Sequence, residues 1–323
     1  MLTNLRKQLK LFNTRYYSLL KGKRSYIRAI GSFFYCAFRH QASAEDFFRY
    51  RFIEKSDYER NKFITYGRSK SIIHHFNASG RTELFNDKRK FNEFFSSMVK
   101  RHWLCTETSD KRQIVDFINT YDRVIAKPLN GGQGKGIFVI SRKQGDDNID
   151  YILKDVIGGG YLLEEIIIQH PLLAEINKDS VNTVRVVTFC YHGEAHIISC
   201  ALRTGVAGSI TDNLHSEASQ CWVVDAETGI VCSASFGYDY QSALFHRGSK
   251  IKVIGLSIPN WDKVISTAKK AALMIPDVAY VGWDVAIMAN DVQLIEGNHD
   301  PGHDLMQMGD NKGKYEMIKN IIR

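Results

Sequence analysis

Two short apolar runs separated by a turn, within residues 280–303, limit what this chain can fold into. Both runs, residues 281–288 and 292–297, are rich in β-branched and other apolar side chains, which favour strands. The three residues between them are Ala, Asn and Asp, and Asn and Asp are common in tight turns. The pattern predicts a β-hairpin centred on Asn290.

Three oxygen-bearing side chains fall on one face of this predicted hairpin. Asp284 lies opposite Glu296 when the pairing is centred on Asn290, and Asn298 follows two residues later on the same side. One interpretation is a solvated polar face, yet both carboxylates lie in apolar runs, where an unpaired charge is costly. Facing carboxylates repel each other, and a cation between them is the simplest remedy. Because oxygen ligands suit Mg²⁺, we predict a metal site here, which a one-residue change of register would abolish.

The composition is that of a folded protein with an uneven charge distribution. The 323 residues are 44% hydrophobic and 24% charged, enough for one large or two ordinary domains. Residues 1–55 hold twelve Lys or Arg and three Asp or Glu, a balance of +9, whereas the whole chain carries +8. The remainder therefore has a net charge of −1 (8 minus 9). Nucleic-acid binding by the main body is not expected.

The cysteines and the N-terminus give an expectation about the compartment. Six cysteines are scattered without a CxxC pair or the spacing of metal ligands, which is typical of a reducing compartment. Residues 29–38 are apolar, but this run is too short for a signal peptide or a membrane span. We expect a cytoplasmic protein.

Residues 1–55 carry apolar and aromatic side chains at helical intervals, with Lys and Arg between them. The pattern predicts one or more amphipathic basic helices. Three roles remain open for these helices. They lie on an anionic membrane surface, making the protein peripheral at the inner face of the membrane, they bind an acidic partner such as a polyanionic glycan, or they pack on the body with their basic faces in water.

A glycine-dense segment, residues 131–136, separates two predicted strands at residues 123–127 and 137–141. Closely spaced glycines let backbone N–H groups approach phosphate oxygens without interference from Cβ atoms. The segment has neither the spacing of a P-loop nor that of a dinucleotide fingerprint. With Lys127 before it and Lys135 within it, phosphate binding is favoured over a plain turn.

Charged side chains also interrupt the elements on either side of this segment. Residues 87–101 predict a capped helix with Lys88 in its first turn, where the helix dipole disfavours a cation. Residues 160–169 predict a strand interrupted by Glu164 and Glu165. These two carboxylates lie either at a solvated edge of a sheet or beside the apolar wall of a nucleotide-base site.

Two arginines lie in a predicted hairpin formed by residues 181–191 and 195–203. Arg185 is in mid-strand among valines, and Arg203 ends the second strand. An arginine in an apolar strand requires an anion, which is either a structural Asp, the commoner partner, or a substrate phosphate or carboxylate. The other predicted elements are a helix over residues 111–119, a hairpin over 221–233 and a helix over 261–274.

In combination, these segments resemble the ATP-grasp superfamily, and most closely its sugar-transfer-associated branch, whose members occur among polysaccharide biosynthesis proteins. The resemblance covers roughly residues 86–312. It rests on five blocks in order: AKPLNGGQGKGIFVI, SVNTVRVVT, LRTGVAGSITDN, VGWDVAI and LIEGNHDPG. One departure is the sequence Leu-His-Ser-Glu at residues 214–217, where the family usually has a glycine pair.

The resemblance implies roles for the residues singled out above. Those that it assigns to ATP are Lys88, Lys127, Gly131, Gly132, Gln133, Gly134, Lys135, Glu164, Glu165 and the backbone near Ile167. Those that it assigns to one or two Mg²⁺ ions between the β- and γ-phosphates are Asp284, Glu296 and Asn298. Those that it places at the γ-phosphate and an acyl-phosphate intermediate are Arg185, Arg203 and Asn213.

The fold that the resemblance implies is an α+β ATP-grasp fold, in which two lobes clasp ATP. A basic helical extension, residues 1–80, precedes the ATP-grasp domain, residues 81–323. Within that domain we expect a glycine-loop lobe over about residues 116–163 and a metal-binding lobe over about residues 164–323.

The activity that the resemblance implies is ATP- and Mg²⁺-dependent ligation of a carboxylate to an amine. The expected substrates are an amino acid or amine and a uronic acid or sugar precursor of a surface polysaccharide such as a capsule or O-antigen. One alternative is a kinase that phosphorylates a hydroxyl of a sugar or another small acceptor. A second alternative is a non-catalytic nucleotide-binding scaffold of a glycan assembly, which has no need to concentrate carboxylates.

Overall fold

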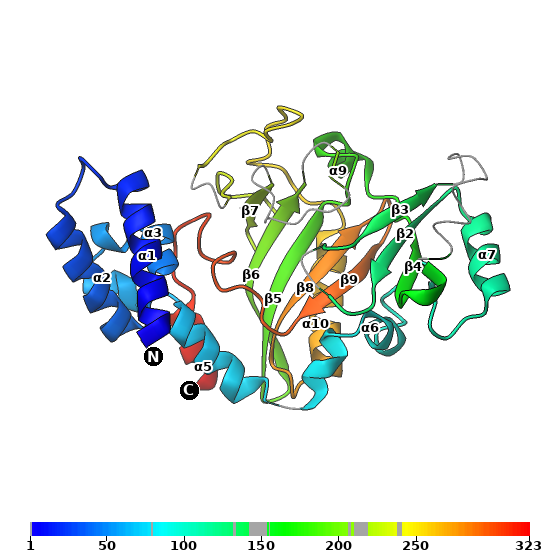
Figure 1. Cartoon of the computed structure of the whole chain (residues 1–323), viewed down its shortest axis with the longest axis horizontal. Coiled ribbons are helices and arrows are strands. Elements are labelled where there is room, and N and C mark those ends of the chain that lie inside the picture. Colours follow the sequence, from blue (N-terminus) through cyan, green and yellow to red (C-terminus); the bar gives the residue numbers. More distant parts are fainter. Residues whose placement is uncertain are drawn as a thin grey trace.

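The chain forms a helical domain at its N-terminal end followed by two antiparallel sheets (Figure 1). The computed structural model describes residues 2–78, 80–131, 134–141, 154, 156–205, 208–209, 219–237 and 241–323. The chain contains both helices and strands, and its strands form antiparallel sheets. The structure therefore confirms the α+β class.

The N-terminal domain is built from α1 (Leu2–Leu19), α2 (Tyr26–His40) and α3 (Ala44–Arg49). These helices confirm the predicted amphipathic helices, and their buried sides form a hydrophobic core of their own, rich in aromatic rings. Phe12 and Phe33 stack at its centre with ring centroids 5.0 Å apart. The domain therefore has an apolar interior that does not depend on the sheets.

The smaller sheet has the order β1-β4-β2-β3. Its strands are β1 (Trp103–Cys105), β4 (Tyr161–Glu165), β2 (Arg123–Pro128) and β3 (Phe138–Ser141), and α7 (Lys111–Thr120) packs on it. The first strand of this sheet, β1, precedes the glycine segment by more than twenty residues in the chain. Since β4 lies between two other strands, the structure excludes one of the two alternatives for this segment, a solvated sheet edge.

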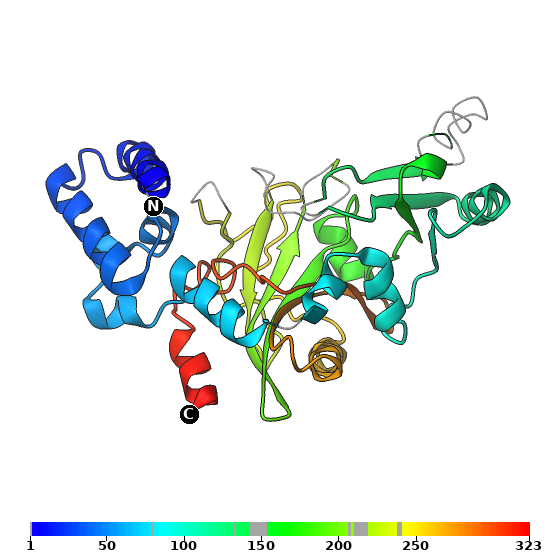
Figure 2. The ribbon, with the colours of Figure 1, turned by 60° about the horizontal axis from the view of Figure 1, so that its bottom comes forward.

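The larger sheet has the order β7-β6-β5-β8-β9. Its strands are β7 (Gln220–Val224), β6 (Glu194–Thr204), β5 (Thr183–Tyr191), β8 (Tyr280–Ile287) and β9 (Val292–Asn298). The central strands β5 and β8 are buried along almost their whole length. They can be buried on both faces because helices and loops cover the sheet (Figure 2).

Several predicted elements agree closely with the structure. The helix α10 (Trp261–Met274) has the predicted bounds and packs against the larger sheet. The β5–β6 hairpin turns at His192 and Gly193, which adopt the left-handed φ angles of 49° and 81° that a two-residue turn requires. Of the predicted hairpin over residues 221–233, only the first half forms a strand, β7. The second half pairs with it through a single β-bridge between Val224 and Val231.

The helix α6 (Lys88–Phe94) is shorter than predicted, because it ends before the predicted limit at residue 101. Its predicted N-cap is confirmed, since the side chain of Asp87 accepts hydrogen bonds from the backbone of Arg89 and Lys90. The remaining helices are η1 (Phe52–Glu54), α4 (Asp57–Asn61), α5 (Tyr66–Phe76), η2 (Gly80–Phe85), α9 (Pro171–Ile176) and α11 (Tyr315–Ile322). Over the part of the chain that the structure describes, no helix has the length and apolar character that crossing a membrane requires.

The β8–β9 hairpin confirms the predicted pairing at its functional end. Asp284 pairs with Glu296, as predicted, but the register near the turn differs by one residue, so that Val285 pairs with Leu294. Ile295 is the extra residue, and it forms a bulge. Without this bulge, Ile295 would lie beside Asp284, and Glu296 would face the core on the other side of the sheet.

The two faces of α2 provide a test of which packing stabilises the helical domain. Phe33 is buried in the core, whereas Phe38 on the same helix is 92% exposed. Phe33→Ala is expected to lower the free energy of unfolding by about 3–5 kcal/mol through the cavity that it leaves. Phe38→Ala should change it by no more than about 0.5 kcal/mol. Urea unfolding followed by circular dichroism measures both, and equal losses would contradict the assignment of the core.

Candidate active site

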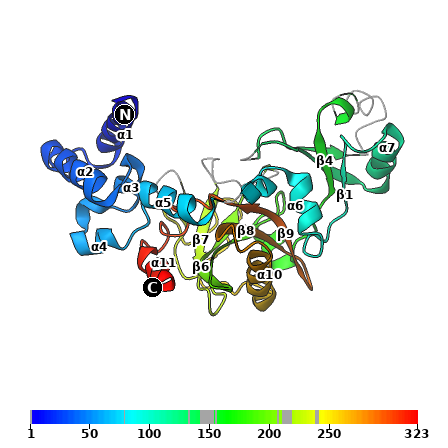
Figure 3. The same ribbon diagram turned by 90° about the horizontal axis from the view of Figure 1, so that it is seen from below.

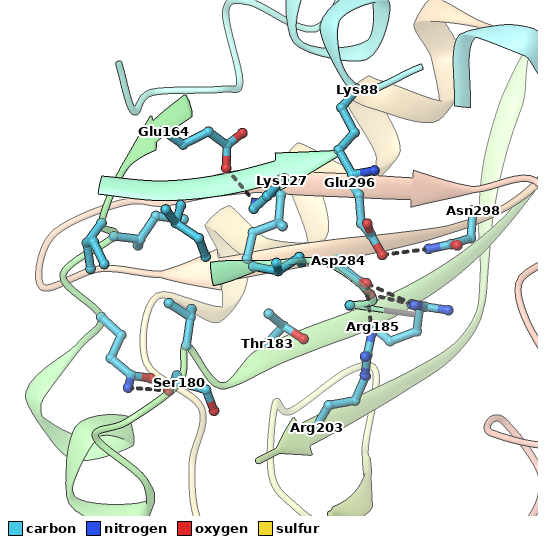
Figure 4. Close-up of a pocket in the computed structure, with 18 of the residues that line it drawn as sticks. Lys88, Lys127, Glu164, Ser180, Thr183, Arg185, Arg203, Asp284, Glu296 and Asn298 are labelled. Carbon is cyan, nitrogen blue, oxygen red and sulfur yellow. Dashed lines mark hydrogen bonds and ion pairs between the residues drawn. The ribbon is translucent and has the colours of Figure 1, made fainter. Parts of the chain in front are cut away.

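A cavity of about 540 Å³ lies between the two sheets, a volume suited to a small-molecule ligand. Strands β2 and β3 of the smaller sheet contribute to one side, and β5, β6, β8 and β9 of the larger sheet contribute to the other (Figure 4). All the predicted site residues that the structure describes line it: Lys88, Lys127, Gly131, Gly134, Lys135, Glu164, Glu165, Ile167, Arg185, Arg203, Asp284, Glu296 and Asn298. Gly132, Gln133 and Asn213 lie outside the described residues.

Two arginines and one aspartate form the floor of the cavity. Arg185 on β5 donates two hydrogen bonds to Asp284 on β8, one to each carboxylate oxygen. Arg203 on β6 donates to Asp284 Oδ2 at 2.7 Å. The three residues come from adjacent strands, so the sheet aligns them. A structural aspartate, one of the two predicted partners of Arg185, is therefore present.

The charges of this cluster keep its aspartate ionised. Burial alone would raise the pKa of Asp284, but the charges of Arg185 and Arg203 lower it to about 2. Asp284 is therefore ionised at neutral pH and faces two positive charges. The floor of the cavity thus presents two guanidinium groups, which are groups suited to contacts with an anionic ligand.

Glu296 and Asn298 lie next to this cluster on β9 and face the same cavity (Figure 4). Asn298 Nδ2 lies 3.4 Å from Glu296 Oε1, and among the described residues no Lys or Arg forms an ion pair with Glu296. The side chain of Glu296 remains exposed to the cavity, but desolvation by the surrounding protein atoms and the negative charge of Asp284 raise its pKa. Both observations mean that a cation bound at Glu296 would relieve an electrostatic cost.

The predicted metal ligands are thus brought together, but not as three equivalent ligands. Both oxygens of Asp284 accept hydrogen bonds from arginines. Glu296 and Asn298 are therefore the side chains at the cavity that could offer oxygen ligands to a metal ion. Over the described residues, no cluster of three or more His, Cys, Asp or Glu is arranged to hold a metal. One carboxylate with an amide oxygen nevertheless fits Mg²⁺, which commonly takes one or two protein ligands and completes its shell with phosphate and water.

A buried chain of charges orders the opposite side of the cavity. Glu164 on β4 is 1% exposed and accepts from Arg101 Nη2 at 2.7 Å, while Lys127 Nζ on β2 lies 2.5 Å from its other oxygen. Burial raises the pKa of Glu164, but the charges of Arg101 and Lys127 outweigh this effect and hold it well below the usual range. Asn92 also donates to Glu164. Glu164 therefore fixes Lys127 in the cavity, whereas Glu165 pairs with the exposed His102.

The glycine segment is anchored from α6. Lys88 Nζ donates to the carbonyl oxygens of Pro128 and Gly131, both at 2.8 Å, and burial lowers its pKa. Gly136 has a φ of 73°, and a Cβ atom there would lie 3.0 Å from the ring of Pro128. Only glycine fits this position without strain. The first turn of α6, with its lysine, thus holds the start of the glycine segment.

The far wall of the cavity is attached to the helical N-terminal domain. His303 Nε2 lies 2.8 Å from Asp46 Oδ1 on α3, and Arg49 on α3 pairs with Asp304. The pair with Asp46 raises the pKa of His303 despite its burial, which favours the charged imidazolium. Residues 300–302, Asp304 and Leu305 line the cavity, so the N-terminal domain supports the site directly.

Sequence reasoning missed several residues of this site. Arg101 lies at the end of the predicted helix 87–101, where no local pattern indicates that it pairs with Glu164. Thr183 lines the cavity two residues before Arg185 on the same strand, so strand alternation was a usable signal for it. The other cavity residues without a prediction include Arg123, Lys178, Asp179 and Ser180.

Comparison with known proteins gives one extensive match. A family model described as sugar-transfer associated ATP-grasp matches residues 67–323. No curated protein matches the chain.

Solved structures of ATP-grasp enzymes are similar to the chain only at a distance. The ATP-grasp ligase PsnB complexed with a minimal precursor has 13% identity and a TM-score of 0.48, over 82% of this chain and 70% of that one. D-Alanine-D-alanine ligase from Helicobacter pylori has 15% identity and a TM-score of 0.47, over 79% and 67%. The ADP complex of purK, N5-carboxyaminoimidazole ribonucleotide synthetase, has 14% identity and a TM-score of 0.44, over 69% and 46%. The chain thus spans less than half of the last of these proteins.

The buried charges around Glu164 give a pH-dependent test. Glu164→Gln leaves Arg101 and Lys127 without their anion and is expected to cost about 3–5 kcal/mol of stability at pH 7. The pKa of Glu164 is lower in the folded than in the unfolded state, so its charge stabilises the fold above the unfolded value of about 4.3. The difference between wild type and variant should therefore shrink as the pH falls below about 4.3, as measured by urea unfolding across pH.

Glu165→Gln is the matched control for this measurement. Its carboxylate pairs with a histidine whose side chain is 76% exposed, so the loss should be no more than about 1 kcal/mol. A loss for Glu164→Gln as small as that for Glu165→Gln would show that the buried charges do not anchor the strand.

Proposed function

The chain belongs to the sugar-transfer-associated ATP-grasp family, and from this membership we propose that it is an ATP- and Mg²⁺-dependent ligase that joins a carboxylate to an amine. The observation that supports this most directly is the floor of the cavity, where two arginines face one aspartate beside the carboxylate of Glu296, which forms no ion pair with a described Lys or Arg. Such a floor combines guanidinium groups for phosphate with a ligand for a divalent cation.

ATP fits the distribution of chemical groups in the cavity. Lys127 and Lys88 bring positive charge to the glycine segment, where the phosphates would lie. The apolar side chains that line the cavity provide a wall for the adenine base: Ile125, Ile137, Val139, Ile166 and Ile167. Glu164 positions Lys127 in this arrangement and is not itself required to touch the nucleotide.

Mg²⁺ would be held by Glu296 and Asn298 and would supply charge neutralisation between the β- and γ-phosphates. Asp284 has a different role in this proposal. It holds Arg185 and Arg203 in place, so that both guanidinium groups face the γ-phosphate. The protein's own contribution is then positioning and electrostatic stabilisation, which is the main requirement of phosphoryl transfer.

The proposed reaction has two steps. An oxygen of the substrate carboxylate attacks the γ-phosphorus, the bond to the β-phosphate oxygen breaks, and ADP leaves. The amine nitrogen then attacks the carbonyl carbon of the acyl phosphate, loses a proton, and inorganic phosphate leaves as the amide forms. Arg185 and Arg203 compensate the negative charge that develops during transfer.

The substrates that we propose are an amino acid or another amine and a uronic acid or sugar precursor of a surface polysaccharide. The family's association with sugar transfer supports this class. Product analysis distinguishes the ligase from a sugar kinase, because a ligase releases inorganic phosphate with its amide, whereas a kinase leaves phosphate on the acceptor. Mass spectrometry after incubation with ATP, amino acids and nucleotide-linked uronic acids would identify either product.

Glu296→Gln tests the metal assignment. We expect Mg²⁺-dependent turnover of ATP to fall by about 100-fold or more, since a preorganised electrostatic contact to the phosphates is lost. The free energy of unfolding should not fall and should rise slightly, because no described cation pairs with Glu296 and the repulsion from Asp284 is removed. Unchanged turnover would remove Glu296 from the metal site.

Asp284→Asn is the contrasting variant. It leaves two buried arginines without an anion, so the protein should lose about 3–5 kcal/mol of stability as well as activity. A stable but inactive Asp284→Asn protein would contradict the structural role of this aspartate. A scaffold without catalysis would show no turnover in the wild type.

A further inference from the structure

Helix α2 has two apolar faces, and only one of them has a partner. The buried face consists of Ala29, Phe33 and Cys36, at intervals of four and three residues. A second row with the same intervals is formed by Ile27, Gly31, Phe34 and Phe38, and all four are exposed. The rows are offset by two residues, or about 200° around a helix, so they lie on opposite sides.

The exposure of this second row is large for apolar side chains. Ile27 is 81% exposed, Phe34 43% and Phe38 92%. A Cβ atom at Gly31, in the middle of the row, would meet no other atom within 4 Å. In the ribbon views, α2 lies at the outer end of the molecule, away from both sheets (Figure 3). Nothing in the described chain covers this face.

The charge of the first 44 residues is of one sign, and the acidic neighbour of α2 that the contacts show, Asp57 on α4, is bonded to Tyr35 and His40. Residues 1–44 contain nine Lys or Arg and no Asp or Glu. Several of these cations are exposed on α2 or in the loop before it: Lys21, Lys23, Arg24, Arg28 and Arg39. A helix with apolar side chains on one face and cations beside it has the composition of a helix that lies in the interface of an anionic bilayer.

We infer that the row Ile27, Gly31, Phe34 and Phe38 docks on the surface of an anionic lipid bilayer. The apolar side chains enter the boundary between headgroups and acyl chains, while the flanking cations contact anionic headgroups. A soluble polyanionic glycan would use the cations but would give no reason for two highly exposed apolar side chains at Ile27 and Phe38. The inference does not rest on the proposed ligase activity, because no residue of the row lines the cavity.

Vesicle sedimentation of the full chain tests this inference. We expect binding to vesicles of phosphatidylglycerol and phosphatidylcholine, little binding to phosphatidylcholine alone, and weaker binding as salt is raised. The double variant Ile27→Ser with Phe38→Ser should bind the anionic vesicles more weakly, by roughly tenfold or more. The reason is that the variant lacks two apolar side chains that the wild type transfers from water into the bilayer.

Leu273→Ser is the matched control, because Leu273 is 45% exposed on α10, outside the N-terminal domain. This control should bind vesicles like the wild type, and thermal unfolding and ATP binding should be the same for all three proteins. Equal vesicle binding by the double variant, or no binding by the wild type, would overturn the inference. Two further results would also overturn it: a dimer that only the double variant abolishes, without vesicle binding, or binding to soluble dextran sulfate but to neither kind of vesicle.

Discussion

A single buried carboxylate, Asp284, determines the layout of the larger sheet at its functional end. It holds Arg185 and Arg203, so it connects three neighbouring strands through side chains as well as through the backbone ladder. An isolated arginine in this interior would be too costly to keep, and Asp284 supplies an anion to both guanidinium groups. The same three side chains thus connect the strands of the sheet and line the cavity.

The sequence indicates the local parts of the site better than its long-range pairs. Alternation along one strand places Glu296 and Asn298 together, and the valines around Arg185 show that this arginine needs an anion. The sequence does not show which residue supplies that anion, because Asp284 lies 99 residues from Arg185 in the chain. Arg101 is missed for the same reason, since its partner Glu164 belongs to another segment and no periodic pattern joins them.

The N-terminal domain is predicted as basic helices, but its connection to the cavity comes only from the folded chain. Its core holds the domain together, while the pairs from Asp46 to His303 and from Arg49 to Asp304 join it to the wall of the site. These pairs are largely shielded from water, so they hold the two parts more firmly than surface ion pairs would. The apolar row on α2 lies on the opposite side of that core. One domain therefore carries both a support for the cavity and a surface that nothing in the described chain covers.

The bulge at Ile295 determines how this hairpin should be aligned with hairpins that lack it. Counted from the turn, Ile295 occupies the position of a residue opposite Asp284, so an alignment without a gap would equate Ile295 with the residue that pairs with this position in a regular hairpin. Placing a one-residue gap at Ile295 restores the match of Glu296. Relatives of this chain should therefore be compared by counting from the Gly282–Asn298 pair, at the far end of the ladder from the turn.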